Sequence, residues 1–406
     1  MRRTARAPKC LKPPLPGIKM VPMIRLALAA VLLGQEPSAL RDRMQAFVER
    51  QEAAGIVAVV GTPDHLDVAA VGHADREKGV PMKADAIFRI ASMTKPLTAL
   101  AILLLEDEGR LSVDDPVEKH LPEFKGQRMV KSKSPEEILL VRAPRPITIR
   151  DLATHTSGLP GAPPPGLSDL YRRRHRTLAE AVAAFSQMPL DFEPGTKWAY
   201  CNTGIDTLGR VVEAVAGASF EAFLSERLFK PLGMTDTFFY PTPELQPRIA
   251  ALYGKKGDGL QRIESFIGDA PDGRYPLPAG GLYSTASDLA RLCRMMLAGG
   301  TWEGRRILSE AAVAKMTSNQ TGDLKAGFTP GVGMGLGWQV VREPQGVTAR
   351  LSPGTYGHGG AFGTQYWIDP VKKRFWILLV QRSGFPNGDA SPLRQALHEA
   401  GASGER

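Results

Sequence analysis

The most reactive arrangement in this sequence is a serine placed three residues before a lysine. Ser92 and Lys95 have this spacing, which on a helix puts the hydroxyl and the ammonium on one face. Pro96 fits best in a first helical turn, so we expect Ser92 at the amino end of a helix that runs to Glu108. Backbone donors and the positive end of the helix dipole would then surround the serine oxygen, as is typical of an activated nucleophile. Because such a pair also arises by chance, the interpretation needs partners from elsewhere in the chain.

The serine needs a group that removes its proton. A lysine with an ordinary pKa of about 10.4 is charged at neutral pH and does not accept one. Burial and nearby cations can either make Lys95 neutral or turn a tyrosine partly into phenolate. Tyr200 is the candidate tyrosine, because it follows Pro194 and Gly195 on a predicted loop and precedes a predicted helix; a half-buried packing residue is the alternative. Asn202 adds a polar side chain that can hold a substrate carbonyl or orient the lysine.

A glycine-rich segment near the carboxyl end is the third candidate. Glycines surround His358 in residues 356–363, just before a predicted strand, and Gly359 and Gly360 follow it directly. Glycine lets backbone approach a ligand closely and present its amide donors. Together with the Ser92 amide, this segment can supply an oxyanion hole. A glycine-rich hairpin without function is the alternative.

The elements that must position these residues point to an α+β fold. The apolar patterning predicts a helix over 40–54, strands over 56–60 and 66–71, strands over 336–341, 364–368 and 375–381, and a last helix over 392–399. Two strands near one end and three near the other predict one mostly antiparallel sheet, flanked by helices and built from both chain ends.

Helices punctuated by proline and glycine occupy the middle of the chain. Helices are predicted over 203–216 and 285–297, and the lysine- and proline-rich residues 125–146 are interpreted as a surface excursion. We therefore expect a sheet domain made of 40–113 and 301–402, an inserted all-helical domain over 114–300, and a basic tail with a possible signal peptide over 1–39.

The net charge of +9 is concentrated at the amino end. Residues 1–25 carry seven basic and no acidic residues, so the remainder has a charge of only about +2, and a nucleic-acid partner is not expected. If translation starts at Met20 or Met23, residues 20–39 have the three parts of a secretory signal, with a possible cut after Ala39. Export to the periplasm or the medium is then expected, and a cytoplasmic location if this segment is the extension of a helix. The apolar run is too short to span a bilayer.

Several other chemistries are not expected. Cys10, Cys201 and Cys293 are too scattered for a disulfide framework or a zinc site, and the seven histidines form no close cluster, so we expect neither a metal nor another cofactor. No Gly-x-Ser-x-Gly segment supports an α/β-hydrolase triad. His155 lies at the end of a short predicted helix and is interpreted as structural rather than as a catalytic base.

In combination, these residues resemble the serine β-lactamase and penicillin-binding-protein superfamily, in the branch of the class C β-lactamases and family VIII carboxylesterases. The resemblance spans residues 40–400 and is carried, in the family's order, by 92–95, 151–160, 192–195, 200–202, 231–234, 280–285 and 358–360. It implies Ser92 as the acylated nucleophile, with Lys95 and Tyr200 as the shared base and acid. It also implies that Asn202 contacts the substrate and the lysine, and that the amides of Ser92 and Ala361 bind the oxyanion.

The sequence departs from the lactamase pattern at two positions. Class C enzymes carry a Lys-Thr-Gly triad where this chain has His358, Gly359 and Gly360. A lysine is a permanent cation that attracts a substrate carboxylate, whereas histidine is mostly neutral at pH 7. The resemblance therefore favours small esters. The second departure is Cys201, where serine or alanine is usual; we interpret it as a small side chain turned away from the pocket.

The expected function is thus a cofactor-free serine hydrolase that acts on a small-molecule ester or amide. A β-lactamase or D-alanyl peptidase with the same site is the nearest alternative, and transfer of the acyl group to an alcohol is also open. A penicillin-binding sensor or binding module without turnover is an alternative of another class. The sequence leaves the oligomeric state open.

Overall fold

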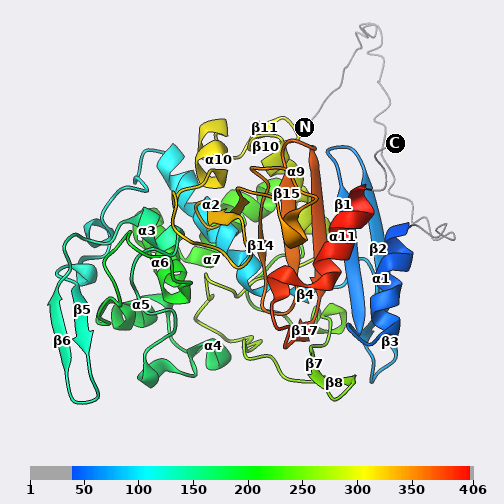
Figure 1. Cartoon of the computed structure of the whole chain (residues 1–406), viewed down its shortest axis with the longest axis horizontal. Helices are drawn as coiled ribbons and strands as arrows, with labels where there is room; N and C mark the ends of the chain where they lie inside the picture. The colour runs from blue at the N-terminus through cyan, green and yellow to red at the C-terminus, as the bar shows by residue number, and fades with distance from the viewer. Residues whose placement is uncertain (1–38, 403–406) are drawn as a thin grey trace, which may run out of the picture. The chain divides into compact units, whose positions relative to one another are not determined.

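An antiparallel sheet of eight strands forms the centre of the structure, a computed structural model that describes residues 39–402 (Figure 1). In order across the sheet, the strands are β12 (Val332–Met334), β13 (Gln339–Val341), β14 (Tyr356–Gly359), β15 (Gln365–Asp369), β16 (Arg374–Val380), β1 (Gly55–Gly61), β2 (Leu66–Asp75) and β3 (Val80–Pro81). Ile56 lies opposite Val380, so the first strand of the chain pairs with its last long strand. The prediction of one antiparallel sheet built from both chain ends is confirmed.

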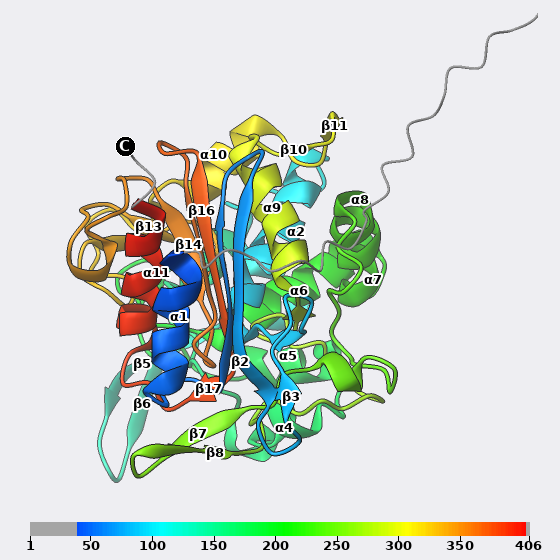
Figure 2. The same ribbon diagram turned by 90° about the vertical axis from the view of Figure 1, so that its right-hand side faces the viewer.

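Helices cover both faces of this sheet. Figure 2 shows α1 (Ala39–Glu49) and α11 (Pro392–Ala402) on one face and α9 (Ala286–Leu297) on the other. Along β1, Ile56 packs in the apolar cluster of α1 and α11, while its neighbour Val57 packs in the main core. Because successive side chains of a strand point to opposite faces, a run of apolar residues buries both sides of the sheet.

The helix that begins beside Ser92 lies at the centre of the molecule. It is α2 (Thr94–Asp107), and all of its residues from Thr94 to Leu105 are buried. A helix that is apolar all round needs neighbours on every side. Helix α6 (Asn202–Ala216) packs against it from the helical region, and α10 (Glu310–Thr317) lies beside it as well. The nucleophile therefore stands on a rigid element.

The helices of the middle region largely follow the sequence. They are α3 (Ile149–Ala153), α4 (Leu170–Arg173), α5 (Leu178–Ser186), α6, α7 (Phe220–Leu224), α8 (Lys230–Leu232) and α9. Thr148 and Asp151 form a capping box at the start of α3, as their spacing predicts, and Thr285 caps α9. The predicted division into a sheet domain and an inserted domain stays a prediction.

The prediction that residues 114–300 are all-helical is wrong. This region also holds the strands β5 (Arg128–Lys133), β6 (Ile138–Arg142), β7 (Tyr253–Lys256), β8 (Gly259–Arg262) and β9 (Tyr283–Ser284), and β10 (Thr301–Trp302) follows it directly. The predicted surface excursion is the β5–β6 hairpin, which projects at the left of Figure 1. Its strands stay largely exposed, with Ile138 53% and Leu139 43% exposed, so they lack the one-sided apolar alternation that identifies a packed strand.

Three short strands complete the described fold: β4 (Phe88–Arg89), which pairs with β9, β11 (Arg305–Arg306), which pairs with β10, and β17 (Arg382–Ser383), which pairs with β7. The predicted signal segment, residues 20–39, lies outside the described residues except for Ala39. Within residues 39–402, no helix has the length and apolar character needed to cross a membrane.

Candidate active site

Ser92 lies in a tight turn directly before α2. The turn is the 3-10 helix Ala91–Met93, and Thr94 begins the α-helix, with Pro96 in its first turn as predicted. Ala91 has a φ of +46°, a conformation that L residues rarely adopt. Backbone strain of this kind persists only where the surroundings impose it. Here Thr94 donates its hydroxyl to the Ala91 carbonyl at 2.7 Å and accepts the Leu282 amide, which fixes the turn.

Two segments distant in the sequence meet around the serine oxygen. Lys95 Nζ lies 3.1 Å from Ser92 Oγ, and the Tyr200 hydroxyl donates to the same oxygen at 2.8 Å. The side chain of Lys95 is fully buried, and its Nζ lies 4.6 Å from the centre of the Tyr200 ring. Nucleophile, lysine and tyrosine are thus within proton-transfer distance, although their catalytic roles stay predictions.

The two partners of Ser92 differ in protonation. Burial lowers the pKa of Lys95 to about 7, although nearby Asp206 raises it. Burial raises the pKa of Tyr200 well above its usual value of about 10, although the hydrogen bond to Ser92 lowers it. Near neutral pH a large fraction of Lys95 is therefore the free amine, while Tyr200 keeps its proton. Of the two possible bases left open by the sequence, the geometry and protonation favour Lys95.

A buried carboxylate that the sequence analysis missed lies behind the lysine. Asp206, on α6, accepts hydrogen bonds from the Tyr275 hydroxyl at 2.6 Å and the Ala279 amide at 2.8 Å. The carbonyl of Ala279 in turn accepts from Lys95 Nζ at 2.7 Å. Burial raises the pKa of Asp206 to about 6, and its charge acts on the lysine. Its position one turn into a predicted helix, on the side of Asn202, was the available signal.

The loop that carries Tyr200 is held by a buried histidine. His155 Nδ1 accepts the Cys201 amide at 3.1 Å, and its ring packs 4.7 Å from the ring of Tyr200 and against Trp198. Burial lowers the pKa of His155 well below its usual value, so it stays neutral. Among the described residues it makes no hydrogen bond to Ser92, and its structural role stays a prediction.

Cys201 and Asn202 begin α6. The Cys201 thiol accepts the Gly204 amide at 3.2 Å as the helix cap, and burial raises its pKa, so the thiol is protonated and turned into the protein. The predicted contact between Asn202 and Lys95 is absent from the described hydrogen bonds, in which Nζ donates to Ser92 and to the Ala279 carbonyl. A contact between Asn202 and a substrate stays a prediction.

The glycine-rich segment contains a strand that the sequence analysis did not predict. The segment lies just before a strand, β15, as predicted, but His358 and Gly359 also belong to a strand themselves, β14, where they pair with Tyr366 and Gln365 of β15. The neighbouring strand supplies their hydrogen bonds, and this stabilises a strand conformation that the glycines themselves do not favour. Gly360 and Ala361 form the turn that follows.

This β14–β15 turn is fastened to the turn that carries Ser92. Thr364 donates its hydroxyl to the Ile90 carbonyl at 3.2 Å, and Tyr366 donates to the Met93 carbonyl at 3.0 Å. Among the described residues, the amides of Ser92 and Ala361 donate to no acceptor. Two free donors on joined turns are what a developing oxyanion requires.

His358 carries no charge in this setting. It is 1% exposed, and burial and the charge of Lys95 lower its pKa to about 3. Nδ1 donates to the Gly359 carbonyl at 2.6 Å, since a carbonyl can only accept, and Nε2 is buried without a hydrogen-bond partner. His358 therefore places no positive charge at this edge of the site near neutral pH.

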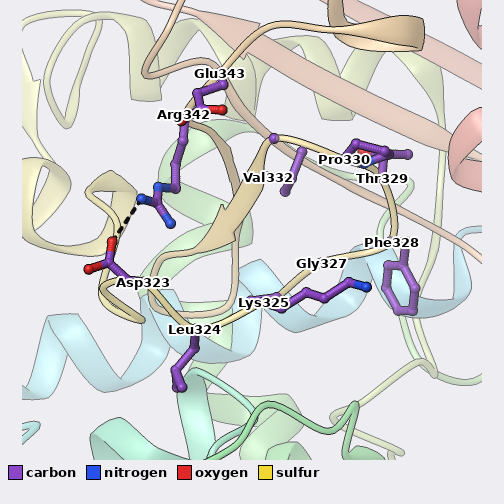
Figure 3. Close-up of a pocket in the computed structure, with 12 residues that line it drawn as sticks. Asp323, Leu324, Lys325, Gly327, Phe328, Thr329, Pro330, Val332, Arg342 and Glu343 are labelled. Atoms are coloured by element: carbon purple, nitrogen blue, oxygen red, sulfur yellow. Dashed lines mark hydrogen bonds and ion pairs between the residues drawn. The ribbon is translucent and has the colours of Figure 1, made fainter.

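A cavity of about 530 Å³ adjoins the site. Figure 3 shows the loop that lines it, with Lys325 and Phe328 near one another and Arg342 bridged to Asp323. The Phe328 ring packs 4.9 Å from the ring of Tyr200, so this residue forms a wall shared by the cavity and the site. Within residues 39–402, no group of three or more His, Cys, Asp or Glu side chains is arranged to hold a metal ion.

The fold and the serine–lysine–tyrosine cluster define the class of this protein, the serine hydrolases of the β-lactamase and penicillin-binding-protein type. The chain belongs to that family: the family model described as Beta-lactamase matches residues 40–400. Such enzymes act on small-molecule substrates.

Particular relatives agree with this assignment. The chain is 36% identical to Protein Rv1367c of Mycobacterium tuberculosis over 78% of this chain and 82% of that protein. It is 31% identical to Esterase EstB of Burkholderia gladioli over 88% of this chain and 92% of the relative. The solved structure of EstCE1, a hydrolase with promiscuous acyltransferase activity, superposes with a TM-score of 0.75 at 24% identity, over 89% of this chain and 97% of that one, and shows the same fold.

Proposed function

We propose that this protein is a carboxylesterase that hydrolyses small neutral esters through an acyl-enzyme on Ser92. The free amine of Lys95 accepts the Oγ proton while Oγ bonds to the ester carbonyl carbon. The carbonyl oxygen becomes an oxyanion, which the amides of Ser92 and Ala361 stabilise. The 3.1 Å distance between Nζ and Oγ supports this first step.

Collapse of the intermediate releases the alcohol. The bond between the carbonyl carbon and the alkoxide oxygen breaks, and the alkoxide takes the Tyr200 proton, which Lys95 then replaces. Water attacks the acyl-enzyme in the second half of the cycle and gives its proton to the same lysine. The acid leaves, and Ser92 regains its hydroxyl. The protonated state of Tyr200 supports its role as the acid.

The observation that carries the choice of an ester is the neutral, enclosed His358. A β-lactam or a peptide terminus presents a carboxylate, and a site without a fixed cation at this edge gains little from it. A neutral ester needs no such cation. The identity with Esterase EstB supports the same choice.

The test is a comparison of substrates on the purified protein. We expect hydrolysis of p-nitrophenyl butyrate with a kcat/KM well above that for a chromogenic cephalosporin. Ser92→Ala should reduce ester turnover at least about 10⁴-fold, because the nucleophile is gone. Ser134→Ala, in the exposed turn between β5 and β6, is the matched control and should behave as wild type.

Each other outcome has a definite meaning. A preference for the cephalosporin replaces the esterase with a β-lactamase that uses the same serine. A stable Ser92 adduct in the intact mass spectrum, without product release, identifies a binding module rather than an enzyme. Ester turnover that survives in Ser92→Ala contradicts the proposed nucleophile.

A further inference from the structure

A carboxylate without a role in the proposed mechanism lies against the glycine-rich edge of the sheet. Asp389 belongs to the 3-10 turn Gly388–Ala390, directly before α11. A Cβ atom built on Gly359 would lie 2.6 Å from Oδ1 of Asp389. The carboxylate therefore packs on the backbone of the strand residue that follows His358, which only a glycine permits.

Two buried glutamines hold this turn in place. Gln339, on β13, donates Nε2 to Oδ1 of Asp389 at 3.1 Å. Gln365, on β15, donates Nε2 to the carbonyl of Gly388 at 3.1 Å. These strands flank β14, so the turn is fixed across the glycine-rich edge. Asp389 itself remains partly exposed, whereas both glutamines are buried.

The same turn adjoins the tyrosine side of the site. Asn387 donates Nδ2 to the carbonyl of Phe328 at 3.1 Å, and the Phe328 ring packs on Tyr200. Asp389 is near enough that its charge contributes to the raised pKa of Tyr200. The carboxylate thus lies against the backbone of Gly359 and acts electrostatically on Tyr200.

Burial raises the pKa of the Asp389 carboxyl, and the charge of the nearby Arg394 lowers it. Arg394 is fully buried, stacks 3.7 Å from the ring centre of Trp367 and donates to the backbone carbonyl of Asp389 rather than to the carboxylate. Lys325, on the loop of the adjoining cavity, is exposed and screened by water. His358 is neutral.

From these contacts we infer that Asp389 is a specificity-determining residue, which favours esters that carry a cationic group and disfavours those that carry a carboxylate. The inference rests on the proposed esterase function and names its substrate class. For two substrates that differ by one charge, a partly exposed carboxylate changes the ratio of their binding constants about fivefold. The carboxylate acts on the substrate's remote group and not on the reacting atoms.

The test uses two esters of nearly identical shape. Butyrylcholine carries a quaternary ammonium, and 3,3-dimethylbutyl butyrate replaces that nitrogen with carbon. We expect wild type to prefer the cationic ester in kcat/KM, and Asp389→Asn to lower this preference about fivefold. Measurable turnover of the neutral ester by Asp389→Asn shows that this variant is folded and active, and the ratio between the two esters cancels any effect that they share.

The matched control is Asp64→Asn. Asp64 lies in the turn between β1 and β2, at the end of the sheet where Gly61 pairs with Phe375. The β14–β15 turn of the active site lies at the opposite end of the strands. This variant removes one carboxylate and should keep the wild-type preference. A preference that is equal in Asp389→Asn and wild type overturns the inference alone, because turnover of the neutral ester by Ser92 still supports the esterase. A wild-type protein that hydrolyses neither ester overturns both.

Discussion

At the scale of single residues, the free energy of burying Lys95 determines what the site can do. An ammonium without solvent loses its hydration, so the neutral amine becomes accessible near pH 7. Asp206 opposes this effect, since a negative charge stabilises the ammonium. The Ala279 peptide connects the two, because its amide donates to the aspartate and its carbonyl accepts from the lysine. These hydrogen bonds therefore hold the lysine in position, while its pKa of about 7 lets it gain or lose a proton near neutral pH.

This balance predicts the pH dependence of turnover. Because Lys95 must lose its proton to act as the base, kcat/KM for a neutral ester should rise as the pH increases through about 7. The raised pKa of Tyr200 means that its deprotonation produces no falling limb below about pH 10. In Asp206→Asn the ammonium loses its stabilising charge, so the rising limb should move to lower pH.

The measurement is kcat/KM from pH 5 to 10 for wild type, Asp206→Asn and a control, Glu213→Gln. Glu213 lies on the same helix and pairs with Arg210 instead of contacting the lysine. The control should keep the wild-type profile. A limb that stays in place or moves to higher pH in Asp206→Asn contradicts the coupling between the aspartate and the lysine.

Sequence reasoning could predict Ser92, Lys95 and Tyr200 because each occurs in a local pattern with a chemical meaning. Asp206 has no such pattern, since its partners come from segments about 70 residues away in the sequence. Asp389 is hidden for the same reason, because its contact with Gly359 arises only when the turn before α11 folds back on the sheet. Long-range contacts of this kind produce no periodic pattern of apolar residues in the sequence.

At the scale of elements, the site depends on how two turns are joined. The turn with Ser92 and the turn after β14 meet where Gly360 approaches the carbonyl of Ile90. A side chain would not fit, because a Cβ atom at this position would lie 2.4 Å from that carbonyl oxygen and 2.2 Å from the hydroxyl of Thr364. Close backbone approach, rather than a special backbone torsion, is what requires glycine here.

Gly360→Ala should therefore force the two turns apart. We expect kcat/KM for a neutral ester to fall at least about 10²-fold, because the Ser92 and Ala361 donors no longer converge. The control is Gly166→Ala, where a Cβ atom meets nothing within 4 Å. Kinetics and circular dichroism of both variants test this expectation. Near-normal turnover by a folded Gly360→Ala protein would show that the oxyanion donors do not depend on this approach.

Helices and strands could be predicted where the burial of one face makes apolar residues recur at the spacing of a helix or a strand. The strands of the central sheet and the helices α6 and α9 follow apolar patterns and recognisable caps, and the structure has them within a few residues of the expected ranges. The β5–β6 hairpin was not predictable, because its exposed strands bury no consistent face. The strand state of His358 was missed because it depends on pairing with β15 rather than on its own glycine-rich sequence.

At the scale of the whole molecule, the core encloses a histidine on the last helix of the described chain. His398, on α11, is 1% exposed, packs on Trp376 and donates Nδ1 to the Val347 carbonyl at 3.2 Å. Burial and the charge of Arg394 lower its pKa to about 3. The unfolded chain protonates this histidine at about pH 6.5, whereas the folded chain does not. Between these two values the unfolded state binds more protons, so the free energy of unfolding falls as the pH decreases.

His398→Gln removes this titration, because glutamine can donate to the same carbonyl without gaining a charge. Between pH 7 and pH 5, wild type should lose about 2 kcal/mol more of its free energy of unfolding than the variant does. Urea unfolding at both pH values measures this difference, and the other titrating groups cancel in the comparison. His65→Gln, in the exposed turn between β1 and β2, should instead follow wild type. If His398→Gln follows wild type as well, the histidine is protonated inside the fold, and α11 must admit water or an anion to accommodate the charge.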